Sequence, residues 1–158
     1  MGAVAWLSDD EQLAWRTLIN VHGHLMSRLD AELQAAHHLG LADYEVLVHL
    51  SEAPERSLRM SELAERLLLS PSGLTRRLDG LVREGLVERQ AYLSDRRGSL
   101  AVLTPAGLAR LEEAAPTHVA GVRSYVVAPL GRDRLLQLAE ILGQIEGALQ
   151  DDQDLAVG

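Results

Sequence analysis

The 158-residue sequence contains no cysteine, no lysine and no long uninterrupted run of apolar residues. The absence of cysteine excludes disulfides, thiolate zinc sites, iron–sulfur clusters and cysteine nucleophiles. No apolar run approaches the roughly 20 residues that a membrane-spanning helix requires. Acidic residues precede any basic cluster, unlike the start of a secretory signal. We therefore expect a cytoplasmic protein without a membrane partner.

The composition is that of one ordinary globular domain, which we expect to cover residues 1–158. Charged residues make up 24% of the chain and the mean hydropathy is −0.01, values unlike those of disordered segments. A chain of this length can bury a core without disulfides or metal ions.

Charge is distributed unevenly along the chain. The net charge is −8, yet residues 56–97 hold nine arginines against six acids and carry +3, which leaves −11 for the rest. All 15 basic residues are arginine, whose planar guanidinium suits bidentate recognition of phosphate and guanine. A codon bias could equally explain the missing lysine, but it does not explain why the arginines cluster.

Apolar residues recur at helical spacing through most of the chain. A capping box beginning at Ser8 predicts the start of a long first helix, and Gly40 predicts its stop. Ser61 and Ser70 are the expected N-caps of the third and fourth helices. The six expected helices cover residues 8–39, 43–50, 62–68, 71–84, 104–128 and 132–149.

A hairpin and two prolines are expected to interrupt the helical pattern. Residues 86–92 and 99–103 read as two short strands joined by a polar turn, which predicts a β-hairpin. Pro116 is expected to kink the fifth helix, and Pro129 to end it. Asp43 is expected to cap the second helix.

The order helix, turn, helix, hairpin is that of a winged helix-turn-helix. Over residues 40–107 the sequence resembles the MarR/SlyA family of winged-helix transcriptional regulators, and the flanking helices fit as well. The matching stretches are SELAER at 61–66, LSPSGLTR at 69–76, LVREGLV at 81–87, DRRG at 95–98 and LTPAG at 103–107.

The resemblance implies a mainly α fold with a small β-wing and a homodimer. Residues 8–39 and 104–150 would form dimerisation helices, and residues 40–103 the DNA-binding lobe. The implied function is a sequence-specific transcriptional regulator, most often a repressor, that binds double-stranded DNA at a pseudo-palindromic operator. A monomeric helical bundle with a satellite domain is the alternative architecture.

The fourth helix is the expected reader of the major groove. If its leucines at 74, 78 and 81 face inward, Arg76 faces outward and is our candidate for a guanine contact. Arg77 points sideways, toward the DNA backbone, and the helix N-terminus suits a phosphate. The alternative is that these arginines pair with acids on a solvated face. The expected DNA contacts on this helix are Ser70, Pro71, Ser72, Thr75, Arg76 and Arg77.

The tip of the hairpin is the second expected reader. In the family pattern that residues 95–97 resemble, the second arginine enters the minor groove and the aspartate orients it. These residues are Arg97 and Asp95 here, and Arg96 is a further cation for phosphate. A narrow A·T-rich groove attracts such an arginine because its potential is the most negative. A plain charged hairpin tip is the alternative.

Many members of the family respond to small anionic aromatic compounds, and an effector of this kind is a possible partner. An aromatic wall with a cation suits a phenolic carboxylate. Core packing is the alternative role for the aromatic residues. The candidate effector residues are Trp15, Arg16, His22, Met26, Tyr44 and His118, with Arg123 nearby in sequence.

A zinc-responsive regulator of the same fold is the alternative function. None of the six histidines has the i, i+4 spacing of a helical zinc pair. A site could still form between helices, for instance from His37 or His38 with His118. We expect exposed or packed histidines instead, with no metal and no cofactor.

No enzyme motif is present. The sequence has no Gly-x-Ser-x-Gly, no P-loop and no Gly-x-Gly-x-x-Gly, and it shows no paired-carboxylate arrangement. We therefore do not expect an enzyme. A winged helix that binds only other proteins remains as an alternative, although the arginines at the hairpin tip argue against it.

Overall fold

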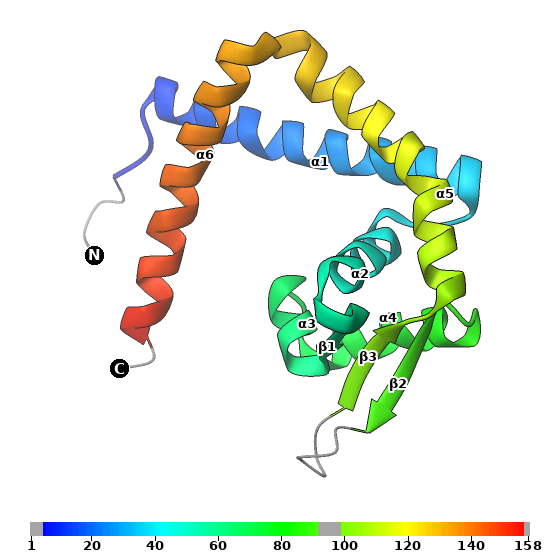
Figure 1. Ribbon diagram of the computed structural model, residues 1–158. Coiled ribbons are helices and arrows are strands. Elements are labelled where there is room, and N and C mark those ends of the chain that lie inside the picture. The colour runs from blue at the N-terminus through cyan, green and yellow to red at the C-terminus, as the bar shows by residue number, and fades with distance from the viewer. Residues whose placement is uncertain (1–4, 92–98, 157–158) are drawn as a thin grey trace. The chain divides into compact units, whose positions relative to one another are not determined.

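The computed structural model describes residues 5–91 and 99–156, with side chains described through residue 150. The chain forms two compact units, Met1–His118 and Val119–Gly158. The first is mostly helical and contains the three-stranded antiparallel sheet, and the second is helical (Figure 1). The predicted class, mainly α with a small β element, is therefore confirmed.

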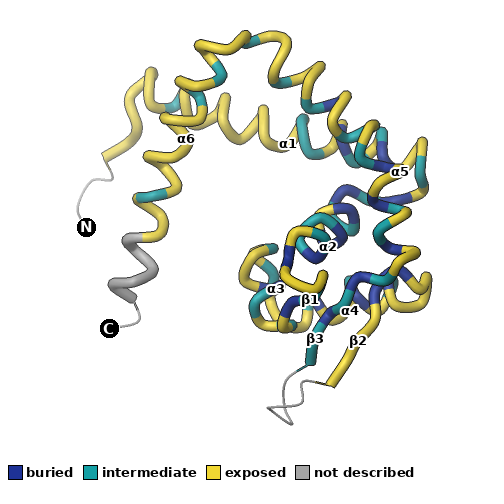
Figure 2. The backbone as a smooth tube through the Cα atoms, in the orientation of Figure 1, coloured by how far each residue is buried: buried dark blue, intermediate teal, exposed yellow. Residues whose placement is uncertain are grey.

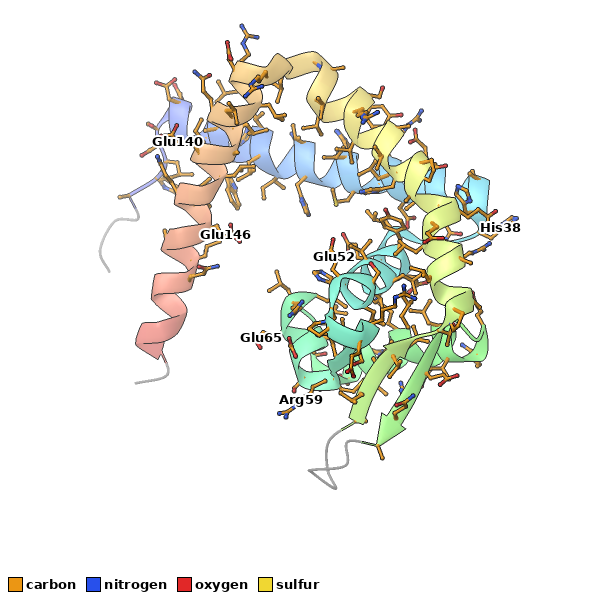
Figure 3. The ribbon with its side chains drawn as sticks, in the orientation of Figure 1. His38, Glu52, Arg59, Glu65, Glu140 and Glu146 are labelled. Atoms are coloured by element: carbon orange, nitrogen blue, oxygen red, sulfur yellow. The ribbon has the colours of Figure 1, made fainter. Side chains whose placement is uncertain are left out.

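Helix α1 spans Asp9–His37 and begins at the predicted capping box. The Ser8 hydroxyl accepts from the Glu11 amide, and the Glu11 carboxylate accepts from the Ser8 amide at 2.7 Å. These bonds lower the pKa of Glu11. His38, labelled in Figure 3, follows the last residue of the helix. It adopts a left-handed conformation (φ 52°) and donates its amide to the Gln34 carbonyl, so the helix ends earlier than Gly40.

Helix α2 spans Leu41–Glu52 and is capped from another helix. The carboxylate of Asp30, on α1, accepts from the Leu41 amide at 2.8 Å. The prediction that Asp43 caps this helix is wrong, because the helix begins before it. The cap thus comes from tertiary packing, which the local sequence could not reveal.

Helices α3, Met60–Arg66, and α4, Pro71–Arg83, form the pair expected of a helix-turn-helix. The N-cap of α3 is Arg59, without a side-chain hydrogen bond, so the prediction of Ser61 is wrong. Ser70 caps α4 as predicted, since its hydroxyl accepts from the Gly73 amide at 3.1 Å. Leu74, Leu78 and Leu81 are buried, which confirms the inward face of α4.

Strands β2, Val87–Ala91, and β3, Ser99–Leu103, form the predicted hairpin. The sequence did not reveal a third strand, β1, which spans Ser57–Arg59 after the short 3₁₀ helix Pro54–Arg56. Strand β3 lies between the other two, and all neighbours are antiparallel (Figure 1). Ser57 faces Val102 in the register, so β1 pairs with residues far away in sequence.

The core lies where α2, α3 and α4 pack with the sheet (Figure 2). It consists almost entirely of leucine, with valine and alanine between. In contrast, the first half of α1 is exposed (Figure 2). The largest fully buried side chains are Leu33, Leu47, Leu50, Leu63, Leu74, Leu78, Leu81, Val46 and Val87.

A tight joint connects the end of the hairpin to helix α5, Pro105–Val122. The Thr104 hydroxyl donates to the carbonyl of Gly85 at 2.7 Å, and the Thr104 amide donates to that of Leu86 at 3.1 Å. The Gly107 amide in turn donates to the Thr104 hydroxyl at 2.9 Å. A Cβ on Gly107 would overlap the Leu86 carbonyl oxygen, so only glycine fits this position.

The helical path after α5 differs from the prediction. Helix α5 contains Pro116, and the kink expected there stays a prediction. The π-helical segment Arg123–Val127 follows the helix. Helix α6 spans Ala128–Ala156 and contains Pro129 in its first turn, so Pro129 does not end a helix. The break lies instead at Gly131, whose φ is +68°. Within the described residues, no helix has the length and apolarity to cross a membrane.

Candidate nucleic-acid interface

The outward face of α4 carries an exposed arginine. Ser72, Thr75 and Arg76 are exposed, opposite the buried leucines of the same helix. Arg76 makes no ion pair or hydrogen bond with any residue that the structure describes, so it does not pair with Asp79 or Glu84. Its guanidinium is therefore available for an external acceptor.

The N-terminus of α4 is compatible with a phosphate. Its first turn contains no acidic residue, and Ser70 provides the cap. The hydroxyls of Ser70 and Ser72 lie 3.2 Å apart, and the Thr75 hydroxyl donates to the Pro71 carbonyl at 2.9 Å. The positive end of the helix dipole lies at this exposed end.

Arg77 lies between α4 and α2 and is about one-third exposed. Its Nη1 is 3.3 Å from Oδ1 of Asp43, with which it forms a hydrogen-bonded ion pair. Asp43, expected to cap α2, instead pairs with this arginine of α4. Whether Arg77 also reaches the DNA backbone stays a prediction.

Sequence reasoning missed the role of Arg89. This residue lies in β2, and its Nη2 donates to the Thr75 carbonyl oxygen at 2.9 Å. The same nitrogen lies 2.9 Å from Oδ1 of Asp79. The strand that leads into the wing is therefore bonded directly to α4. A single arginine in a strand gives no local signal of such a contact.

The three expected wing-tip residues, Asp95, Arg96 and Arg97, lie outside the described residues. Their roles remain predictions. The strands on either side of them are described, and β2 and β3 pair antiparallel from Val87 with Leu103 to Ala91 with Ser99.

The expected effector residues fall into separate groups. Trp15 and Arg16 line a hollow of about 270 Å³ near the start of α1, together with Trp6, Leu7 and Gln12. Met26 is eleven residues further along the same helix, about 16 Å away at 1.5 Å per residue. His22 is exposed between them. A single pocket from these α1 residues within one chain is therefore not formed.

Tyr44 and His118 form the second group. Their ring centroids lie 4.7 Å apart. Burial raises the pKa of Tyr44. Burial also lowers the pKa of His118, and the negative charge of Glu45 partly offsets this second shift. The Nδ1 atom of His118 is buried and has no hydrogen-bond partner among the described residues. Arg123 belongs to the second compact unit.

The histidines do not assemble a recognisable metal centre in the part of the chain that the structure describes. There, no group of three or more histidine, aspartate or glutamate side chains could hold a metal ion. His37 bonds to the Thr117 hydroxyl through Nε2 at 2.8 Å. The His118 ring contacts that of Tyr44 in a tilted arrangement, with 34° between the ring planes.

Comparison with known proteins identifies the family. Residues 38–98 match the MarR family model. The crystal structure of AbsC, a MarR family transcriptional regulator from Streptomyces coelicolor, is 39% identical with a TM-score of 0.88. The match covers 94% of this chain and 99% of AbsC. The chain belongs to the MarR family of transcriptional regulators. The resemblance stated from the sequence is thus confirmed.

Two further relatives of this MarR-family chain are informative. Sco3205, a MarR family regulator from the same organism, was solved in complex with DNA. It is 36% identical over 92% of each chain, with a TM-score of 0.88. The Bacillus subtilis repressor YetL is 34% identical, but the match covers only about half of each chain, 52% of this one and 50% of YetL. All three relatives are described as transcriptional regulators or repressors, not as enzymes.

Proposed function

We propose that this MarR-family regulator is a sequence-specific repressor that binds double-stranded DNA as a homodimer. The observation that carries the proposal is the exposed Arg76 on the outward face of α4, which pairs with none of the residues that the structure describes. The DNA complex of Sco3205 and the repressor YetL support it by relationship. The net charge of −8 does not oppose it, because the arginines gather in residues 56–97.

In this proposal, α4 enters the major groove and Arg76 reads a guanine through its O6 and N7 atoms. Ser70, Ser72 and the helix N-terminus bind a phosphate and set the position of the helix. Arg97 enters the adjacent minor groove, oriented by Asp95, and Arg96 adds attraction to phosphate. Two symmetric lobes then require half-sites about one helical turn apart, roughly 34–36 Å.

Exposed apolar side chains support the homodimer. In each unit they recur along a helix and are exposed, whereas burial in an interface would be favourable. Sedimentation at micromolar concentration is expected to give twice the chain mass. A monomer that still binds its operator tightly would contradict the proposal. The exposed residues are Leu13, Trp15, Leu18, Ile19 and Val21 on α1, and Leu136, Ile141, Leu142, Ile145 and Leu149 on α6.

Selection from a random DNA library tests the proposed function directly. The protein is expected to enrich a pseudo-palindrome, to which binding weakens steeply with salt. Arg76→Ala is expected to cost about 1–3 kcal/mol and to relax specificity at one position in each half-site. Arg28→Ala is the matched control, because it removes an exposed arginine of α1 that pairs with Glu32 at 3.1 Å. Equal losses for the two variants would refute the assignment of Arg76.

We also propose a small anionic aromatic effector for the hollow beside Trp6 and Trp15. The two indole rings provide apolar surface, and Arg16 provides a cation that bonds Gln12 at 3.0 Å. The chain has only two tryptophans, and both line this hollow. Titration with a phenolic carboxylate is therefore expected to quench tryptophan fluorescence and to release DNA. Release of DNA without quenching would place the effector elsewhere.

A further inference from the structure

One side chain of strand β2 bonds to the backbone of α4 next to its outward face. Arg89, in β2, donates to the carbonyl oxygen of Thr75 at 2.9 Å. That carbonyl belongs to the peptide group that joins Thr75 to Arg76. The bond therefore acts on the backbone unit from which the exposed side chain of Arg76 projects.

A second contact fixes the orientation of the same guanidinium. Nη2 of Arg89 lies 2.9 Å from Oδ1 of Asp79, one turn after Thr75 on α4. One planar group thus contacts two successive turns of the helix. Both contacts are made by Nη2, whose two N–H donors point in fixed directions in the guanidinium plane, whereas a lysine ammonium is a point charge on a flexible stem.

Asp79 is the only acid in α4, and it is about half exposed. A carboxylate on a helix that approaches phosphates opposes binding by charge repulsion. In contact with Arg89, the Asp79 carboxylate instead holds the arginine side chain in place and offsets the arginine's positive charge. Arg89 is about one-third exposed, so without Asp79 its charge would be open to any phosphate.

We propose that Arg89 is a positioning residue for Arg76, and that the pair Arg89–Asp79 sets DNA specificity rather than general affinity. This inference rests on the proposed function. Arg89 fixes the rotation of α4 relative to the strand that leads into the wing. Asp79 limits attraction of Arg89 to phosphates, which carry no sequence information.

Binding to two duplexes separates these effects. One duplex is the sequence that the parent protein enriches from a random library, and the other is a scrambled duplex of equal length and composition. In Arg89→Lys the charge is kept, so affinity for the scrambled duplex and the salt slope are expected to stay unchanged. Affinity for the enriched duplex is expected to fall at least about fivefold, the lower end of what one good base contact contributes.

Asp79→Asn and Asp43→Asn form a matched pair. Each removes one negative charge beside an arginine, either Arg89, which contacts α4 from β2, or Arg77, which lies on α4. The ion-pair distances are 2.9 Å and 3.3 Å. Asp79→Asn is expected to raise affinity for the scrambled duplex. The ratio of affinity for the enriched duplex to affinity for the scrambled duplex is therefore expected to fall. Asp43→Asn is expected to raise both affinities by the same factor and leave the ratio unchanged. Equal ratios in the two variants would overturn the role of Asp79.

A double variant identifies the position that Arg89 controls. If Arg89 acts through Arg76, adding Arg89→Lys to Arg76→Ala lowers the ratio no further than Arg76→Ala alone. Independent, additive losses would overturn the inference, as would a lower melting temperature in Arg89→Lys with an unchanged ratio. Failure of the parent to enrich any duplex is a different outcome, because it overturns the proposed function itself.

Discussion

The joint at Gly107 allows a prediction whose magnitude follows from the geometry. A Cβ added there would overlap the carbonyl oxygen of Leu86 and would lie 2.7 Å from Cδ1 of Leu103. The leucine side chain can move, but the carbonyl is backbone and accepts the Thr104 amide at 3.1 Å. In Gly107→Ala, therefore, the first turn of α5 must move away from the end of the hairpin.

Two costs contribute to the expected loss of stability. Overpacking a close contact typically costs about 1–3 kcal/mol, and a weakened backbone hydrogen bond adds about 1 kcal/mol. The free energy of unfolding is therefore expected to fall by about 2–4 kcal/mol. At about 2–4 °C per kcal/mol for a chain of this size, the melting temperature falls by about 4–16 °C.

Gly80→Ala is the matched control in the same unit. Gly80 lies inside α4, and a Cβ there would meet no atom within 4 Å. Alanine is expected to stabilise the helix by about 1 kcal/mol, since it restricts the unfolded chain and favours the helix. Thermal unfolding followed by circular dichroism at one protein concentration compares the two variants. A melting temperature of Gly107→Ala equal to that of the parent would refute the steric argument.

Three further predictions concern the turn before α4, the wing and pH. Leu68 is 91% exposed with a φ of +53°, so Leu68→Gly is expected to raise stability by up to about 1 kcal/mol, measured by urea denaturation, because it relieves left-handed strain. Arg97→Ala is expected to weaken specific DNA binding with folding unchanged, and Asp95→Ala to weaken it less; tighter binding of Asp95→Ala in a gel shift would show that Asp95 is only an unfavourable charge. Burial lowers the pKa of His118 below its usual 6.5, so near this pH the folded state binds fewer protons than the unfolded state. The stability that neutral His118 contributes is therefore present above pH 6.5 and is lost as pH falls below it. The drop in melting temperature between pH 7.5 and 5.5 is therefore expected to be smaller in His118→Gln, and an equal drop would contradict this reasoning.

Local sequence determined the features whose cause lies within a few residues. The capping box at Ser8 and the cap at Ser70 depend on side chains that bond amides three residues away, so the sequence predicted both helix starts. The leucine spacing in α4 predicted its buried face, because one helix face repeats every three to four residues. The family resemblance rested on motifs of this local kind and was confirmed by the match to AbsC.

Only tertiary structure decided the contacts between residues that are distant in sequence. Strand β1 has three residues and exists because β3 supplies its hydrogen-bond partners. Asp30 caps a helix eleven residues away, and Arg89 reaches back fourteen residues to Thr75. A carboxylate or guanidinium on a surface has many possible partners, and packing alone selects one of them. For this reason the sequence identified Arg76 as a candidate DNA contact, but only the fold could show how Arg89 holds its backbone.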